Sequence, residues 1–521
     1  MKRGAGLLFA GAAALGVFAV LCSRFPETLF FWDEFQLAYG VLDFDLARHQ
    51  PHPPGYLLFV WLGRLLLPVA GEPELALRWV AAAGSAGFAA LAVGRPPGGL
   101  SRAATAGFAL AAAVFAVGSP LVGRYGLVGL SYTAEGALWC AWLLAFASRP
   151  GGRQLTLLVL AAGLAGGLRP TLALWTAVFL AWAALGRGAW LPRARWIPLA
   201  GTFLAGLALW VAPLIWESGG FAAWREASTS LAAGNIWAKS IFARGPDGFF
   251  AARLLPMLDD LARGLGLLAA IAAMVAARRF RRGDPCLAHL DPLLAGAALA
   301  FLFYALLIYD TAGYLLAVAM PLAVHALRGA AIVTAGLEAR RQPAVAGAVL
   351  FAAGLVAIAP DGLAPNERFD LHDARLEARF AAVRRETPAR ATVLVTSQEY
   401  RDYGLRHVAH YLPEHPTLQL VRDDFFAIVS DETPWLVSEA RTLRAIGPAQ
   451  LDLGTLVPDT SLAQVIYMLP AGDDGVVTES CARLLRGLDV GNGETLQRIV
   501  LQPGWRVIAH RGRLDCRPSA D

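Results

Sequence analysis

The segment from Gly55 to Ala70 reads GYLLFVWLGRLLLPVA and decides how the rest of the chain threads a membrane. It is short for a span, because a helix needs about 20 apolar residues to cross roughly 30 Å of hydrocarbon. Arg64 also interrupts it, while Tyr56, Phe59 and Trp61 are side chains that suit a membrane–water interface. We therefore predict an amphipathic helix that lies at the outer interface without crossing.

The chain around this segment is strongly apolar. Of its 521 residues, 56% are hydrophobic and only 16% are charged, which excludes an ordinary soluble domain as a description of the whole. The first apolar run is interpreted as a span, since no small-residue cleavage pair precedes Cys22. About eleven runs are long enough to cross, near residues 4–22, 74–94, 103–121, 130–147, 154–168, 170–186, 196–216, 256–277, 292–308, 312–328 and 343–359.

Arginine-rich loops set the orientation of these runs. If residues 55–70 do not cross, the basic loops all fall on the side of Lys2 and Arg3, as the positive-inside rule requires. If they do cross, every one of these loops becomes external. The N-terminus is therefore predicted to be cytoplasmic, together with Arg95/Arg102, Arg149/Arg153, Arg187/Arg193/Arg195, Arg278/Arg279/Arg281/Arg282 and Arg340/Arg341.

Charged residues become dense after about residue 360, which divides the chain into a membrane domain, 1–360, and a C-terminal domain, 361–521. The topology places the second domain outside the cytoplasm. Its pattern predicts a strand at 391–396, a helix at 399–411 and a strand at 418–422, and hence an α/β fold. It contains no glycine-rich phosphate loop, so we expect an accessory role.

Composition also indicates where the protein works. The bias toward Ala, Gly and Arg is typical of a GC-rich bacterial genome, so the membrane would be the bacterial inner membrane and the outer domain periplasmic. Arginine is dispersed among short loops, which argues against a nucleic-acid partner. In an oxidising compartment Cys481 and Cys516 can form a disulfide, although the sequence leaves open whether they are close.

The first outer loop contains adjacent carboxylates in Phe30-Phe31-Trp32-Asp33-Glu34-Phe35, just beyond the first span. Acids this close to hydrocarbon are costly and usually have a partner or a task. A solvated carboxylate that only marks the translocated side is the alternative. A rigid turn, Arg48-His49-Gln50-Pro51-His52-Pro53-Pro54-Gly55-Tyr56, follows about fifteen residues later and leads into the interfacial helix.

This pair of motifs resembles the GT-C class of membrane glycosyltransferases, in particular the family 39-like group of protein mannosyltransferases and aminoarabinose transferases. Three later motifs resemble the family's outer-face acid, basic turn and late gating helix, over about 330 residues in all. They are Ser131-Tyr132-Thr133-Ala134-Glu135, Gly167-Leu168-Arg169-Pro170, and Gly313-Tyr314-Leu315-Leu316 with Pro321. Residues that would name a subfamily through its acceptor are not recognisable.

The resemblance implies a polytopic helical fold and transfer of a sugar from a polyprenyl-phosphate donor to an acceptor hydroxyl at the outer face. By similarity, Asp33 is the base and acts on the acceptor hydroxyl opposite the leaving phosphate, so that the product anomer is inverted, with Glu34 as its modulating neighbour. Arg169 would hold the donor phosphate, helped by Tyr314 and His52. Glu135 either faces the same cavity or pairs with Arg124.

Each of these side chains also has a reading without catalysis. Arg169 can be a snorkelling interfacial arginine, Tyr314 an interfacial tyrosine, and His52 a residue that shapes its loop. The sequence shows no strong metal-ligand set and indicates no cofactor, while a role for a divalent cation stays open. The expected partners are membrane lipids, the polyprenyl-phosphate sugar and a protein, lipid or glycan acceptor.

Two other functions compete with transfer. A lipid or glycan transporter or flippase would also have many spans, but the polar residues gather at one face and the halves show no repeat. An envelope assembly factor would use the outer domain to bind a partner, and replacing Asp33 would then leave function intact. The sugar, carrier length, acceptor and oligomeric state are not encoded in any pattern that we identify.

Overall fold

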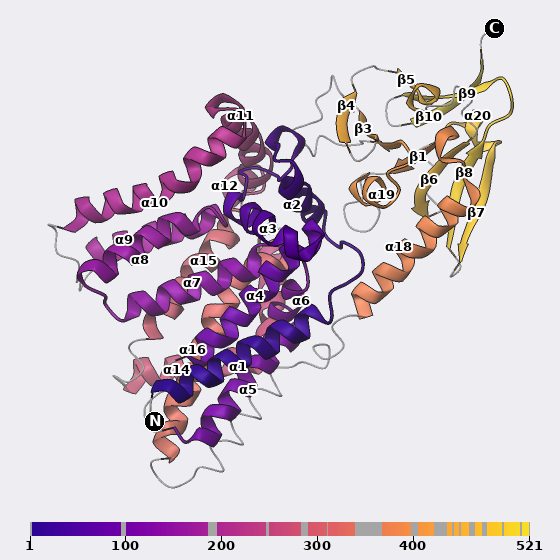
Figure 1. Cartoon of the computed structure of the whole chain (residues 1–521). Coiled ribbons are helices and arrows are strands. Elements are labelled where there is room, and N and C mark those ends of the chain that lie inside the picture. Colours follow the sequence, from indigo (N-terminus) through magenta and orange to yellow (C-terminus); the bar gives the residue numbers. More distant parts are fainter. Residues whose placement is uncertain are drawn as a thin grey trace. The chain divides into compact units, whose positions relative to one another are not determined.

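The computed structural model shows the chain as two compact units (Figure 1). The first consists of Met1–Phe25, Leu37–Leu46 and Gln50–Asn366, and the second of Pro26–Gln36, Ala47–His49 and Glu367–Asp521. The structure describes residues 3–94, 100–185, 195–245, 249–282, 290–309, 311–338, 367–396, 405–420, 435–439, 442–446, 450–457, 464–470, 477–491, 494–510 and 513–519.

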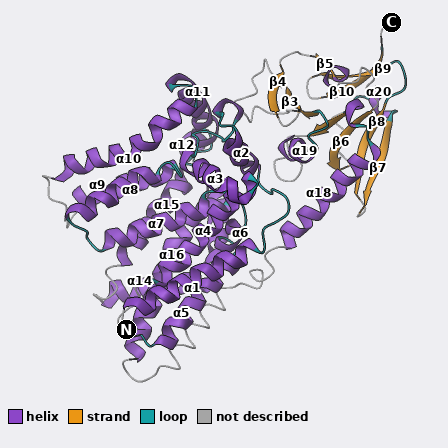
Figure 2. Ribbon diagram, in the orientation of Figure 1, coloured by secondary structure: helices purple, strands orange, loops and turns teal. Residues whose placement is uncertain are grey.

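The described part of the first unit is helical (Figure 2). Its helices are α1 (Arg3–Cys22), α2 (Trp32–Leu42, which begins in the second unit), α3 (Leu57–Ala70), α4 (Pro73–Val93), α5 (Arg102–Gly118), α6 (Val122–Gly126), α7 (Tyr132–Ala147), α8 (Gly152–Ala165), α9 (Pro170–Leu185), α10 (Trp196–Glu217), α11 (Phe221–Leu231), α12 (Ile241–Arg244), α13 (Leu255–Leu265), α14 (Leu267–Arg282), α15 (Asp291–Leu306) and α16 (Leu316–Glu338). Short helical turns occur at η1 (Leu46–Arg48), η3 (Ala232–Trp237), η4 (Phe250–Leu254) and η6 (Ala312–Leu315).

Small residues let helix α7 pack closely on both of its neighbours. A Cβ at Gly84 of α4 would lie 2.5 Å from the backbone of Ala134, and one at Gly136 would lie 3.0 Å from the carbonyl oxygen of Leu316 in α16. The Thr133 hydroxyl donates to the carbonyl oxygen of Ala81 at 2.7 Å across the first contact. Such close backbone approach is how helices associate where lipid provides no hydrophobic drive. The first turn of α7 is therefore fixed between α4 and α16.

Helices α8 and α10 meet in the same way. Added Cβ atoms at Gly163 and Gly206 would each lie 2.4 Å from a carbonyl oxygen of the opposite helix. The Trp210 indole donates to the carbonyl oxygen of Gly163 at 2.9 Å. This crossing fixes the end of α8, and hence the turn that follows it.

Three described helical segments are long and apolar enough to cross a membrane by length and composition: Pro73–Val93, Trp196–Glu217 and Ala312–Ala335. Shorter apolar helices occupy the other runs near 4–22, 103–121, 154–168, 170–186 and 292–308, and α7 covers the run near 130–147. The run at 343–359 lies outside the described residues. The count of about eleven spans stays a prediction.

The run at 256–277 is not the straight span that we expected. It is divided between α13 and α14, with a 94° bend between Phe250–Leu265 and Leu267–Arg281. Gly266 makes the bend with φ 52° and ψ −134°, a conformation that glycine adopts far more easily than other residues. In α13, Met257 and Leu261 are buried while Asp259 and Arg263 form an exposed ion pair. A prediction from apolar content alone does not distinguish this amphipathic helix from a span.

The second unit is built on two sheets. Its helices are α18 (Glu367–Glu386), α19 (Leu405–Tyr411) and α20 (Glu479–Ala482), with 3₁₀ turns η8 (Ala389–Ala391) and η9 (Leu453–Leu456). A seven-stranded sheet has the order β4-β3-β2-β1-β6-β8-β7, in which β1 runs parallel to β2 and β6, and a smaller one has the order β10-β9-β5. The strands are β1 (Thr392–Thr396), β2 (Thr417–Leu420), β3 (Trp435–Glu439), β4 (Thr442–Ile446), β5 (Gln450–Asp452), β6 (Gln464–Pro470), β7 (Leu485–Gly491), β8 (Glu494–Val500), β9 (Trp505–His510) and β10 (Arg513–Pro518).

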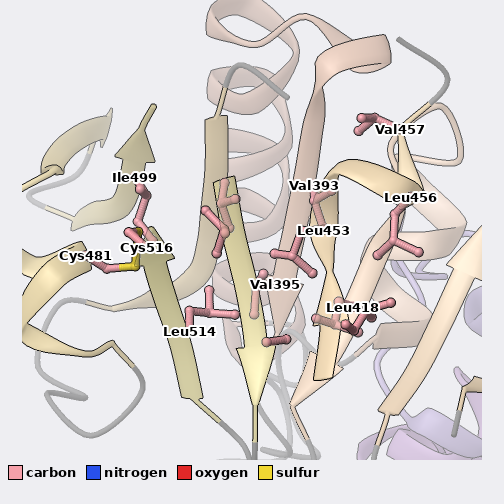
Figure 3. Packing of buried hydrophobic residues seen from close by; sticks show 14 of the residues in the cluster. Val393, Val395, Leu418, Leu453, Leu456, Val457, Cys481, Ile499, Leu514 and Cys516 are labelled. Atoms are coloured by element: carbon pink, nitrogen blue, oxygen red, sulfur yellow. A yellow bond between two sulfur atoms is a disulfide. The ribbon is translucent and has the colours of Figure 1, made fainter. Parts of the chain in front are cut away.

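Alternation along β1 divides the core of this unit into two layers. Val393 and Val395 join the cluster shared with the smaller sheet, shown in Figure 3, whereas Leu394 joins the cluster formed with α18 and α19. Successive side chains of a strand point to opposite faces, so this strand is buried on both. The predicted strand at 391–396 and the mixed α/β character are confirmed. The helix at 399–411 is described from Leu405, and the strand at 418–422 is described as far as Leu420.

A disulfide joins Cys481 of α20 to Cys516 of β10 inside the first of these clusters (Figure 3). The sequence left open whether the two cysteines are close, and their Cα atoms are 4.9 Å apart. Among the described cysteines, Cys22 and Cys140 are free.

Burial of His407 gives the second unit a predicted pH dependence. Its ring is fully buried, and burial, together with the neighbouring His372 and His410, lowers its pKa to about 3. In the unfolded chain His407 binds a proton near pH 6.5, whereas in the folded chain it binds one only near pH 3. The free energy of unfolding therefore falls as the pH falls from about 6.5 to about 3.

Replacing His407 with leucine is expected to reduce this slope by up to about 1.4 kcal/mol per pH unit. Urea midpoints of the second unit between pH 7 and pH 4 measure it. Burial also lowers the pKa of His415, but that contribution is common to wild type and variant. Equal slopes for the two proteins would contradict the prediction.

Candidate functional site

Arg169 lies in a turn that the surrounding sequence holds tightly. Helix α8 ends at Ala165, and Pro170 begins α9. At Gly167, which lies between them, an added Cβ would meet Leu58 at 2.6 Å and Trp210 at 2.8 Å. Its carbonyl oxygen accepts from the backbone N–H of Leu58 at 2.9 Å. The start of α3 is thus bonded directly to the turn that carries Arg169.

The guanidinium of Arg169 pairs with Glu135 in the first turn of α7. Nε lies 3.0 Å from Oε2 of Glu135, and the two side chains are only 6% and 1% exposed. This contact has the distance of an ion pair but not hydrogen-bond geometry. Nη1 donates to Ser131 Oγ at 3.3 Å, and the Thr171 hydroxyl donates to Oε1 of Glu135. The pair therefore neutralises both charges away from water, and the alternative pairing of Glu135 with Arg124 is wrong.

Tyrosine rings surround the guanidinium. Its carbon lies 4.1 Å from the ring centre of Tyr132, 5.1 Å from Tyr314 and 5.6 Å from Tyr56. Tyr304 stacks on Tyr314 with 4.9 Å between centres. Cations are attracted to aromatic faces within about 6 Å. We call Arg169, Glu135, Tyr56, Tyr132, Tyr304 and Tyr314 the arginine cluster.

One guanidinium nitrogen has hydrogen-bonding capacity to spare. Within the described parts of the chain, Nη2 of Arg169 has no hydrogen-bond partner, whereas Nη1 is engaged with Ser131. Arginine has five N–H donors and recognises phosphate through pairs of them. The cluster therefore has the charge and the donors to bind one anionic oxygen group.

The late turn depends on a glycine. A Cβ at Gly313 in η6 would lie 2.7 Å from the rings of both Tyr125 and Tyr132, so only glycine lets this turn approach them. The next residue, Tyr314, then contacts Arg169. The predicted meeting of Arg169 and Tyr314 is present in the structure.

His52 contacts Tyr56, which in turn contacts the guanidinium of Arg169. Its ring packs on Tyr56 with 4.7 Å between centres, and Tyr56, at φ 44°, begins α3 and contacts Arg169. This placement fits the role in loop shape better than direct phosphate contact. A contribution to phosphate binding stays a prediction.

Asp33 and Glu34 belong to the second unit, not to the first as the division at residue 360 implied. Glu34 is 1% exposed, and its Oε2 accepts from the backbone N–H of Phe30 at 3.0 Å and of Phe31 at 2.9 Å. This is the backbone contact that a Glu in the first helical turn makes in a capping box. Glu34 thus caps helix α2.

Asp33 is partly exposed in the same first turn of α2. Consecutive helical side chains point in directions about 100° apart, so Asp33 and Glu34 do not face each other. The modulation of Asp33 by Glu34 stays a prediction.

No protein-family model and no curated protein matches the sequence. Among solved structures, the crystal structure of ArnT from Cupriavidus metallidurans bound to undecaprenyl phosphate matches with a TM-score of 0.58 at 12% identity. The match covers 96% of this chain and 99% of that one, and ArnT is a GT-C aminoarabinose transferase. The chain has a GT-C fold.

This GT-C fold confirms the resemblance that the motifs at Asp33, His52, Glu135, Arg169 and Tyr314 suggested. It also accounts for the helical first unit followed by a C-terminal sheet region, as in ArnT. At 12% identity the match concerns the fold, so the roles of individual residues stay predictions.

One member of the arginine cluster, Tyr304, and one residue that donates to it, Thr171, had weak sequence signals. Tyr132 and Glu135 are three residues apart, which places them on one helix face and was readable from the motif. Tyr304 lies inside the apolar run 292–308, where nothing distinguishes it, and Thr171 follows Pro170 without any pattern. Among the described residues, no group of three or more His, Cys, Asp or Glu is arranged to hold a metal ion.

Proposed function

We propose that the protein is a membrane glycosyltransferase that moves a sugar from a polyprenyl phosphate to an acceptor hydroxyl at the outer face of the membrane. The observation that carries the proposal is the buried guanidinium of Arg169, held by Glu135 and tyrosines with Nη2 free of described partners. It occurs in a fold shared with a protein crystallised with undecaprenyl phosphate.

The chemistry follows from where charge develops. Asp33 takes the proton of the acceptor hydroxyl as its oxygen attacks the anomeric carbon. The bond from that carbon to the phosphate oxygen breaks, and its electron pair leaves with the polyprenyl phosphate. Arg169 stabilises this added negative charge, and Tyr314 contributes a hydroxyl donor. Attack opposite the leaving group inverts the anomer.

Polar contacts of two arginines, Arg64 and Arg328, support the proposed topology. Arg64 in α3 pairs with Glu217 at the end of α10 at 3.0 Å, and the Trp61 indole donates to the same carboxylate at 2.8 Å. The arginine pattern places that end of α10 outside, so α3 reaches the outer interface there. At the opposite end of the first unit, Arg328 donates to the carbonyl oxygens of Leu91 and Gly94, which end α4.

The disulfide supports an oxidising compartment for the second unit. With the N-terminus in the cytoplasm and about eleven spans, we propose a bacterial inner-membrane protein whose C-terminal domain is periplasmic. A transfer assay with membrane acceptors would identify the acceptor as a protein, a lipid or a glycan.

Replacing Asp33 with asparagine is expected to lower sugar transfer by about 10²-fold or more, because a positioned base contributes roughly 10²–10⁴-fold. Transfer of radiolabelled sugar from a panel of polyprenyl-phosphate sugars to membrane acceptors measures it, at equal folded yield and with donor binding recorded separately. Glu27→Gln is the control, because Glu27 is an exposed carboxylate in the same loop.

Equal transfer by wild type and Asp33→Asn would remove Asp33 from the mechanism. Absence of transfer by the wild type across the panel would favour transport or assembly instead.

A further inference from the structure

Five consecutive backbone N–H groups, from Glu27 to Phe31, donate to side-chain oxygens instead of to a helix or a strand. The acceptors of the last two lie on Glu34 of the same segment, whereas the first three are supplied by α18 and α19. These three bonds run from Glu27 to Asp373 at 2.8 Å, from Thr28 to Asp373 at 3.1 Å and from Leu29 to the Tyr411 hydroxyl at 2.8 Å.

Asp373 is suited to hold this segment. It is 9% exposed, and its carboxylate also accepts from the Thr28 hydroxyl. Burial alone would raise the pKa of Asp373, but the nearby His372, with Nδ1 3.9 Å from Oδ1, and hydrogen bonds from Thr28 and the two amides lower it below its usual value. An ionised carboxylate forms stronger hydrogen bonds to amides than a neutral group does.

Aromatic contacts fix the residues on either side of Asp33. Trp32 lies under the guanidinium of Arg406, with 5.3 Å between its ring centre and Cζ. Phe35 is fully buried, with its ring 4.5 Å from His407. Both partners come from α19, so the first turn of α2 has few ways to shift.

We propose that the C-terminal unit is part of the catalytic machinery, with Asp373 as the positioning residue for Asp33 and Tyr411 as its helper. This rests on the proposed function, in which Asp33 is the base. A base must lie within hydrogen-bond reach of the proton it takes, and a displacement of about 1 Å can cost about 10²-fold in rate. The accessory role that the sequence suggested for residues 361–521 is thereby replaced.

The test uses Asp373→Asn in the full-length protein. The amide of asparagine retains one acceptor and turns a donor toward an N–H group. We expect faster hydrogen exchange at Glu27, Thr28 and Leu29, and a transfer rate lower by about 10–100-fold per bound donor. Normalising the rate to the stoichiometry of bound polyprenyl phosphate removes any contribution from unfolded molecules.

Two further variants make the result specific. Asp515→Asn is the matched control, since Asp515 also accepts hydroxyl hydrogen bonds and has a pKa lowered mainly by Ser480, but lies in β10. It should change neither exchange at 27–29 nor transfer. Tyr411→Phe removes the acceptor for Leu29 and keeps the ring on Phe380, so a few-fold loss is expected even if Asp373→Asn folds poorly.

The outcomes are distinct. Faster exchange with slower transfer per bound donor supports the proposal. Faster exchange with wild-type transfer overturns the positioning role. Unchanged exchange in both Asp373→Asn and Tyr411→Phe overturns the hydrogen bonds from residues 27–29 to Asp373 and Tyr411. If wild type transfers no sugar but exchange still responds, the proposed function fails and the catalytic role of these hydrogen bonds fails with it, while the bonds stand as structural contacts.

Discussion

Replacing Arg169 with methionine is expected to abolish sugar transfer and to destabilise the first unit. Glu135, which is 1% exposed, would become an uncompensated buried carboxylate. Breaking a buried ion pair from one side costs about 3–5 kcal/mol. Transfer is lost in addition because no positive charge would face the leaving phosphate. Thermal unfolding in detergent and the radiolabel transfer assay measure the two effects.

A double variant separates these effects. In Arg169→Met/Glu135→Gln both charges are gone, so much of the stability should return while transfer and polyprenyl-phosphate binding stay absent. Arg64→Met is the matched control, because the Arg64–Glu217 pair is 33% and 21% exposed and lies two turns along α3 from the cluster. Wild-type transfer by the folded double variant would show that Arg169 does not bind the donor.

Removing the disulfide is expected to destabilise the second unit by about 3–4 kcal/mol. The bond closes a loop with a sequence separation of 35, for which chain entropy predicts a cost of this size. Cys481→Ala/Cys516→Ala, with limited proteolysis of the second unit at increasing urea concentration, measures it. Both cysteines are buried in the core, so alanine avoids placing hydroxyl groups there.

Cys22→Ala is the control for this experiment, since Cys22 is a free cysteine of the first unit. It should leave the urea midpoint of the second unit unchanged. A midpoint for Cys481→Ala/Cys516→Ala equal to that of the wild type would show that the disulfide contributes nothing to stability.

Much of the first unit could be predicted because lipid imposes a simple rule. Apolar runs of sufficient length become helices, and turns between them collect the polar residues. Arg169 next to Pro170 and Tyr314 next to Gly313 were therefore visible in two turns between apolar runs. Their meeting depends on Gly167 and Gly313, whose missing side chains allow the contacts.

Other features depend on contacts that no local pattern records. The bend at Gly266 interrupts a run whose apolar content looks continuous. The sequence shows Glu34 as half of a carboxylate pair, but no pattern shows that it accepts from backbone amides of its own loop. The link from Glu27 to Asp373 spans 346 residues, a distance at which one sequence gives no pairing signal.

That separation has a consequence for how the protein is made. At roughly 5–20 residues per second, the ribosome needs roughly 20–70 s to proceed from Glu27 to Asp373. Throughout this interval the loop that carries Asp33 has been synthesised but has none of the acceptors that α18 and α19 provide. The hydrogen bonds from this early loop to α18 and α19 can therefore form only after those helices have been synthesised. A chain released early would contain every described helix of the first unit and still lack a finished acid-bearing loop.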